Sequence, residues 1–158
     1  MTESLSKNGE PSKEFTDLWQ KAVRSQSARD DLDSFGIHVS LAEEEVDWLT
    51  KRLRATESGQ IQELAATFLG QPYLMLPSEC ATRLIEIASD KSGYPPAIFR
   101  AAVALWNHGI NIDDAHPILQ AVAARNQEFL RNTLPDSIDS MVVVAEDLLH
   151  REAVNKEK

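Results

Sequence analysis

Apolar residues recur at intervals of three and four positions along most of this chain, and polar residues fill the positions between them. This spacing gathers the apolar side chains on one face of an α-helix. Seven segments are therefore expected to be helices, at about residues 12–26, 40–54, 58–70, 78–89, 95–108, 114–132 and 136–154. The valines at 142–144 would also suit a short strand, but the helical spacing around them favours a helix.

Several predicted boundaries carry residues that commonly start or end helices. Ser40, with Glu43 three positions later, forms a capping-box motif at the start of the second helix. Gly70 suits a left-handed residue at the end of the third helix. Asp113 or Asp114 would cap the sixth helix, because a carboxylate can accept free backbone N–H groups.

The segment 95–108 is apolar on nearly all sides and opens with Pro95 and Pro96, which fit the first turn of a helix. It is therefore predicted to be the central helix, surrounded by the others. Residues 1–11 are polar and are predicted to be a disordered tail, so that residues 12–154 form the helical domain. The expected fold is an all-α, single-domain bundle of about seven helices with orthogonal or up-down packing.

Composition narrows the functional classes. The chain has 158 residues and a formal net charge of −9, and a negative surface repels nucleic-acid phosphates and anionic lipids. The single cysteine, Cys80, excludes an intrachain disulfide and a zinc site built from several cysteines. No apolar stretch matches a membrane span or a secretory signal. These features predict a cytoplasmic protein with no membrane partner.

The first functional hypothesis is a non-enzymatic protein–protein interaction module, such as an adaptor, a regulatory subunit or an inhibitor. No catalytic motif is recognised in the sequence, and no cofactor is predicted. A basic protein would suit the acidic surface, and association into a homo-oligomer stays open. The predicted contact residues combine carboxylates with aromatic anchors, as interfaces do: Asp30, Asp31, Asp33, Glu44, Glu45, Trp48 and Tyr73.

The second hypothesis is a metal-dependent or small-ligand-binding enzyme. His108, Asp113, Asp114 and His116 fall within nine residues, and imidazole and carboxylate groups can share a divalent metal. Arg100 would then anchor an anionic substrate. The alternative for the same residues is structural, because the aspartates suit the start of a helix and His108 suits the end of one.

The third hypothesis is a DNA-binding regulator. Residues 104–119 have the order of a helix-turn-helix, with a helix, a glycine, a short turn and a second helix. The second helix, however, opens with Asp113 and Asp114, which would face the DNA phosphates. Nucleic acid is therefore the less favoured partner.

Cys80 lies in the first turn of the predicted fourth helix, where the helix dipole favours a thiolate. A catalytic cysteine also needs a base nearby, and the surrounding sequence suggests none. An unreactive thiol is therefore expected.

Overall fold

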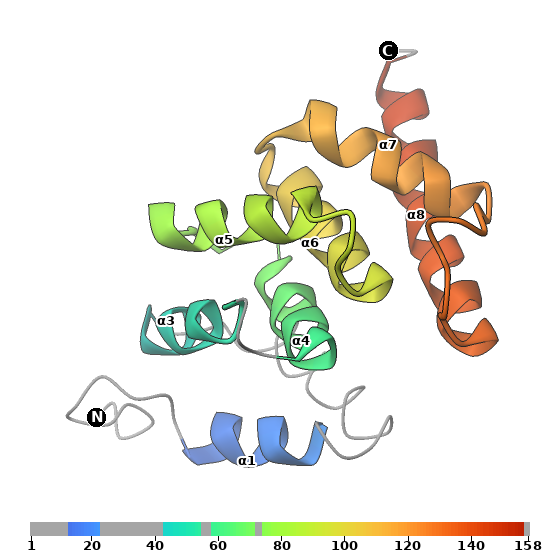
Figure 1. Ribbon diagram of the computed structural model, residues 1–158. Helices are drawn as coiled ribbons and strands as arrows, with labels where there is room; N and C mark the ends of the chain where they lie inside the picture. Colours follow the sequence, from blue (N-terminus) through green and yellow to red (C-terminus); the bar gives the residue numbers. More distant parts are fainter. Residues whose placement is uncertain (1–12, 23–42, 55–57, 72–73, 157–158) are drawn as a thin grey trace.

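The computed structural model describes residues 13–22, 43–54, 58–71 and 74–156, and within these ranges it contains seven α-helices and no strand (Figure 1). The all-α bundle predicted from the sequence is confirmed. The predicted tail, residues 1–11, lies outside the described residues, so the domain boundary stays a prediction. The helices are α1 (Lys13–Ala22), α3 (Glu43–Lys51), α4 (Gly59–Leu69), α5 (Ser78–Ser89), α6 (Pro95–His108), α7 (Ile112–Ala123) and α8 (Pro135–Lys156).

Helix α6 lies at the centre of the fold, as its composition predicted. It packs against α4 and α5 on one side and against α7 and α8 on the other (Figure 1). Every residue from Pro95 to Phe99 and from Ala101 to Leu105 is buried. A helix with apolar residues all round would expose apolar surface to water on any uncovered side, and this exposure is unfavourable. Such a helix is therefore most stable when other helices surround it.

The core is divided into two apolar clusters that meet at α6. One cluster joins α1, α3, α4 and α5 to the α6 face that carries Ala97, Ala101 and Leu105. The other joins α7 and α8 to the α6 face that carries Phe99 and Val103. Helix α6 contributes buried residues to both clusters and so joins the two halves of the molecule.

The sequence predicted the start of α4 correctly, but it did not predict the backbone conformation at the end of this helix. Ser58 caps the helix, and its hydroxyl oxygen accepts a hydrogen bond from the Ile61 backbone N–H at 3.3 Å. Gly70 follows the helix with φ −77°, so the predicted left-handed conformation is wrong. A side chain at Gly70 would lie nearest to the backbone carbonyl oxygen of Thr67, at 3.3 Å, in the last turn of α4. The Ser40 motif lies outside the described residues.

Helix α7 is shorter than its sequence pattern predicted. It ends at Ala123 rather than near residue 132, because Arg125 adopts a left-handed backbone conformation with φ 54°. Asn132, at the predicted end, is also left-handed, with φ 55°. At its start the helix begins at Ile112, after a left-handed Asn111. The aspartates 113 and 114 therefore lie in the first turn, and the prediction that one of them is the cap residue is wrong.

Helix α8 begins at Pro135, one residue before the predicted start, and continues through the valines at 142–144. Its buried face consists of Met141, Val142, Ala145 and Leu148, which pack against α7 and α6. Within the described residues, no helix is both long enough and apolar enough to cross a membrane.

Candidate binding groove

The predicted acidic and aromatic contact surface is described only in part. Asp30, Asp31, Asp33 and Tyr73 lie outside the described residues. Glu45 on α3 is buried, with 4% of its surface exposed, and Glu44 beside it is half-buried. This surface stays a prediction.

Trp48 on α3 belongs to an aromatic cluster that holds α1 in place. Its ring meets Trp19 edge to face at 4.9 Å and Phe15 at 5.7 Å, measured between ring centroids. Phe15 also stacks on Phe68 of α4, and the Arg52 guanidinium lies 4.1 Å from the centre of the Trp48 ring. Edge-to-face and stacked contacts of this kind stabilise a core beyond the area that they bury. Trp48 thus contributes to packing between helices.

The histidines at the corner between α6 and α7 contact different parts of the fold. His108 Nε2 lies 3.0 Å from the carbonyl oxygen of Leu69 on α4, so Nε2 donates the hydrogen bond. His116 Nε2 lies 3.3 Å from Glu152 Oε1 on α8, and the His116 ring stacks on Trp106. In the part of the chain that is described, no three His, Cys, Asp or Glu side chains gather as metal ligands would.

The other two residues of the corner, Asp113 and Asp114, are exposed in the first turn of α7, and Asp114 accepts a hydrogen bond from the Asn111 side chain at 3.0 Å. Arg100, the predicted anion anchor, is half-buried on α6, with its guanidinium 5.4 Å from the centre of the Phe99 ring. Arg100 and the four corner residues therefore do not converge on one described site.

A groove of about 660 Å³ opens on the side of the molecule where α5, α6 and α7 meet the segment 124–134. We call it the α5–α7 groove. Its apolar lining residues, called the floor below, are Ala88, Ile98, Pro117, Ile118 and Phe129. Its polar lining residues, called the rim below, are Ser89, Lys91, Asp114, Asn126, Glu128 and Arg131. An apolar floor with a polar rim is typical of sites that bind another molecule.

Arg131 fixes one wall of the groove. Its Nη2 donates to the carbonyl oxygens of Lys91 at 2.7 Å and Gly93 at 3.3 Å, in the turn between α5 and α6. Its Nη1 donates to the carbonyl oxygens of Glu128 and Phe129 in its own segment. One guanidinium therefore ties together two loops that both contribute residues to the groove.

Two further contacts shape the same wall. The Asn126 side-chain oxygen accepts a hydrogen bond from the Phe129 backbone N–H at 2.9 Å, which turns the chain so that Phe129 faces the groove. Arg125 forms an ion pair with Asp139 of α8 at 2.9 Å, which joins the segment to the last helix. The wall is therefore built from residues that the sequence pattern assigned to a continuous helix.

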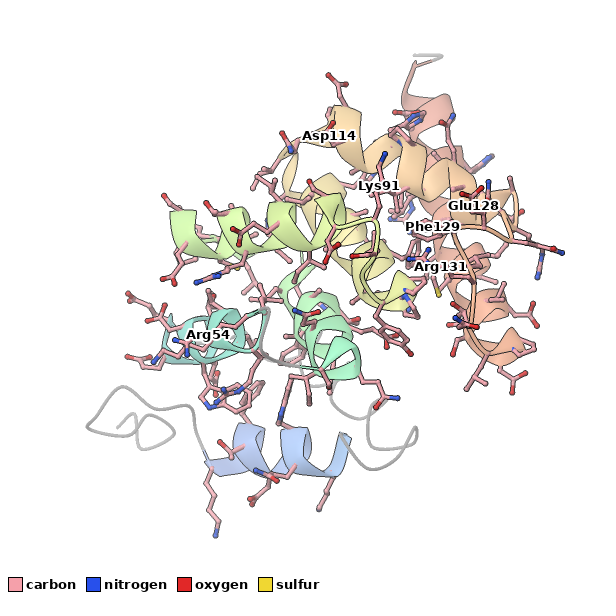
Figure 2. All side chains as sticks on the ribbon, in the orientation of Figure 1. Arg54, Lys91, Asp114, Glu128, Phe129 and Arg131 are labelled. Carbon is pink, nitrogen blue, oxygen red and sulfur yellow. The ribbon has the colours of Figure 1, made fainter. Side chains whose placement is uncertain are left out.

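The rim carries charges of both signs, and Figure 2 shows how they are distributed. Asp114 lies near the start of α7, whereas Glu128 lies beyond its end, with Lys91 on the α5 side of the groove (Figure 2). Among the described residues, neither Lys91 nor Glu128 has a side-chain ion-pair partner. These charges are thus available to a bound molecule.

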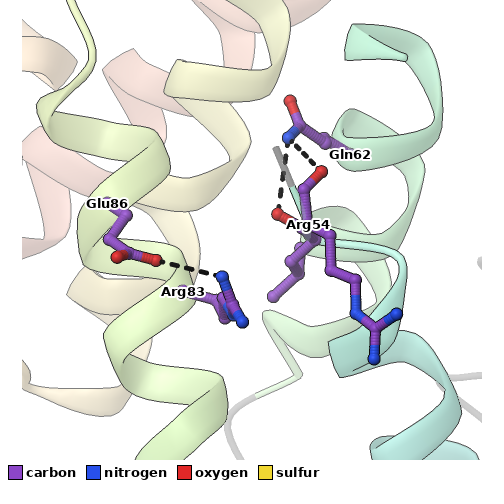
Figure 3. A network of polar contacts seen from close by, with 5 residues as sticks. Arg54, Gln62, Arg83 and Glu86 are labelled. Carbon is purple, nitrogen blue, oxygen red and sulfur yellow. Dashed lines mark hydrogen bonds and ion pairs between the residues drawn. The ribbon is translucent and has the colours of Figure 1, made fainter. Parts of the chain in front are cut away.

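A smaller pocket of about 430 Å³ lies on the other side of the α5–α6 turn, and Ile98 lines both. Its polar side chains are largely paired within the protein (Figure 3). Gln62 donates to the backbone oxygens of Leu53 and Arg54, just beyond the end of α3, and Arg83 lies 3.6 Å from Glu86. This pocket is therefore the weaker candidate for a binding site.

Cys80 is fully buried against α3. Burial raises the pKa of its thiol, a hydrogen bond with Thr50 lowers it, and the negative charges of Asp47 and Glu79 raise it further. The net result is a pKa above the usual value, so the group is a neutral thiol near pH 7.

Comparisons of the chain with protein-family models, with curated proteins and with solved structures found no match. The groove therefore has to be understood from its own geometry. The sequence reasoning missed it because the groove depends on where α7 ends. The asparagines at 126 and 132 were the available signal, since asparagine favours turns and left-handed conformations.

Proposed function

We propose that this protein is a non-enzymatic interaction module that binds a segment of a partner protein in the α5–α7 groove. The observation that supports this function best is an open groove whose lining combines apolar and charged side chains. Apolar side chains of a partner would leave water on this floor, while the rim would set orientation and specificity. The formal net charge of the chain, −9, favours a basic partner.

The construction of the groove supports binding by a preformed site. Its walls come from α5, α6 and α7 together with the segment that Arg131 holds in place. A site whose shape is fixed before binding loses little conformational entropy when its partner arrives. This property suits a module that recognises a short segment without changing its own fold.

The proposal is tested by placing a photo-crosslinking amino acid at Ser89, on the rim of the groove, and separately at Ser140, on the exposed side of α8. We expect the Ser89 position, and not the Ser140 position, to crosslink to one defined protein in cells of the native host. A second pair of variants, Ser89→Trp and Ser140→Trp, checks the result by affinity purification. Only Ser89→Trp should lose that protein, because a large side chain at the rim obstructs the groove. Equal recovery by both variants would reject the groove as the binding site.

A further inference from the structure

The described residues contain three sulfur atoms, and these differ widely in their exposure to solvent. Met141 on α8 is 2% exposed, and Cys80 on α5 is fully buried. Met75, in the link between α4 and α5, is 92% exposed. The chain has one cysteine and three methionines, and the remaining methionine, Met1, lies outside the described residues. Met75 therefore carries the described sulfur that a reagent in solution can reach.

The link between α4 and α5 keeps Met75 in this position. Residues 74–77 have no regular secondary structure. Leu74 belongs to the apolar cluster around α4 and α5, and Leu76 packs against the same cluster. Neighbouring side chains of an extended chain point in opposite directions, so two leucines directed inward leave the residue between them directed outward. Met75 accordingly belongs to neither apolar cluster.

The chemistry of a thioether makes this exposure important. The sulfur of methionine carries a free lone pair and needs no deprotonation before it reacts, so access to the oxidant decides which methionine is oxidised. Met141 is enclosed by residues of α6, α7 and α8, and its sulfur is reached only when this part of the core opens. The buried thiol of Cys80 is shielded in the same way.

We propose that Met75 is a site of reversible oxidation to methionine sulfoxide by hydrogen peroxide. A lone pair of the sulfur attacks one peroxide oxygen, the O–O bond breaks, and the second oxygen leaves as water with both protons. The sulfur loses two electrons and the peroxide gains them. A methionine sulfoxide reductase reverses the change, since two thiols of that enzyme supply two electrons, form a disulfide and release the oxygen as water.

Oxidation at Met75 changes the surface of the protein and leaves the fold intact. The sulfoxide replaces an apolar group by a polar one at a position that contributes to no core, whereas the same change at Met141 would place a polar group inside one. The accessible sulfoxide is also open to the reductase. This inference does not depend on the proposed function, because Met75 is not among the residues that line the α5–α7 groove.

The test is a time course of the full-length protein with hydrogen peroxide, followed by trypsin digestion and mass spectrometry. Arginines lie between the two methionines, so Met75 and Met141 fall in different peptides of the same molecules. We expect Met75 in the folded protein to oxidise at least about tenfold faster than Met141, and the two rates to agree within about twofold in urea. Equal rates in the folded protein, or faster oxidation of Met141, would overturn the proposal.

The variant Met75→Leu tests whether the fold is indifferent to oxidation at this position. The oxidised wild type and the variant treated in the same way should keep the thermal midpoint of the untreated wild type. A lower midpoint in the oxidised wild type alone would show that Met75 supports the core, which contradicts a purely superficial site.

Reversibility is tested on the folded, oxidised protein with the two methionine sulfoxide reductases that act on the two sulfoxide epimers. A short peptide that contains methionine sulfoxide verifies that both enzymes are active. We expect the mass of the Met75 peptide to return to its unoxidised value. Persistence of the sulfoxide in the protein, with full repair of the control peptide, would reject reversible oxidation at Met75.

Discussion

The Cys80 thiol stands in the first turn of α5, where the helix dipole stabilises a thiolate, yet its pKa is raised. Burial explains the difference, since the desolvation of a thiolate is more unfavourable than its interaction with the helix dipole is favourable. The neighbouring charges of Asp47 and Glu79 raise the pKa further. At this site the surroundings of the side chain outweigh its position in the sequence.

We predict that Cys80 in the folded protein reacts with iodoacetamide at pH 8 at least about tenfold more slowly than in 8 M urea. The physical reason is that alkylation needs an accessible thiolate. The rate is measured by mass spectrometry, and because Cys80 is the only cysteine, the unfolded chain is its own control. Equal rates in the two states would contradict a buried thiol with a raised pKa.

The same pKa predicts a dependence of stability on pH. The folded state holds the thiol proton more tightly than the unfolded state, so its contribution is complete below the unfolded pKa. This contribution of the Cys80 thiol to the stability of the folded state is lost as the pH rises through the pKa of the folded state. Between pH 7 and pH 10, urea unfolding should show the wild type losing stability relative to Cys80→Ala. A difference between the two proteins that does not change with pH would argue against this prediction.

Two glycines, Gly59 and Gly109, allow two effects of an added side chain to be compared. A Cβ at Gly59 would clash with the Tyr94 Cβ, whereas one at Gly109 would meet no atom within 4 Å. Gly109 is left-handed, with φ 68°. We expect Gly59→Ala to destabilise the fold by about 1–3 kcal/mol through overpacking, and Gly109→Ala by about 1 kcal/mol through backbone strain. Crystal structures of the variants would show Tyr94 displaced only in the first, and an unmoved Tyr94 would count against the overpacking explanation.

At the scale of the elements, the segment between α7 and α8 has the greatest effect on the candidate site. It is joined to the α5–α6 turn by Arg131 and to α8 by Arg125. Two left-handed residues, Arg125 and Asn132, bracket it. A wall of this kind depends on a few side-chain contacts, because it has no continuous helical hydrogen bonding.

We predict that Arg131→Ala lowers the free energy of unfolding by about 1 kcal/mol and speeds amide hydrogen exchange at Gly93 and Phe129. The loss of four donated hydrogen bonds releases the two loops from each other. Arg83→Ala is the control, since Arg83 makes a half-exposed ion pair at 3.6 Å within α5 and should cost less than about 0.5 kcal/mol. Unchanged exchange at Gly93 in Arg131→Ala would show that the turn is held by other contacts.

At the scale of the whole molecule, α6 is shared by two apolar clusters. Leu84 of α5 belongs to the first cluster and Leu119 of α7 to the second, and both are fully buried. Because α6 contributes residues to both, neither cluster keeps its core if α6 unfolds. The two halves should therefore behave as one cooperative unit.

We expect Leu84→Ala and Leu119→Ala each to lower the free energy of unfolding by about 2–5 kcal/mol, since each leaves a cavity in a packed core. Urea unfolding followed by circular dichroism and by tryptophan fluorescence should give one coincident transition for both variants. Two separate transitions in Leu119→Ala would mean that the α7–α8 half unfolds on its own.

The sequence by itself determined the helices and the place of α6. Periodic apolar residues, prolines at positions 95 and 135, and a glycine after α6 are local signals, and a helix depends mainly on local hydrogen bonds. The buried face of α8 followed from the same spacing. These features need no knowledge of distant residues.

Only the tertiary structure decided where α7 ends and where the groove lies. The apolar spacing continues past Ala123, to Phe129 and Leu130, although the backbone turns at Arg125. The turn depends on partners far along the chain, such as the carbonyl group of Lys91 for Arg131 and the carboxylate of Asp139 for Arg125. Likewise, the corner histidines contact Leu69 and Glu152 on other helices. Such contacts form only when the helices pack, and therefore no local pattern could have specified them.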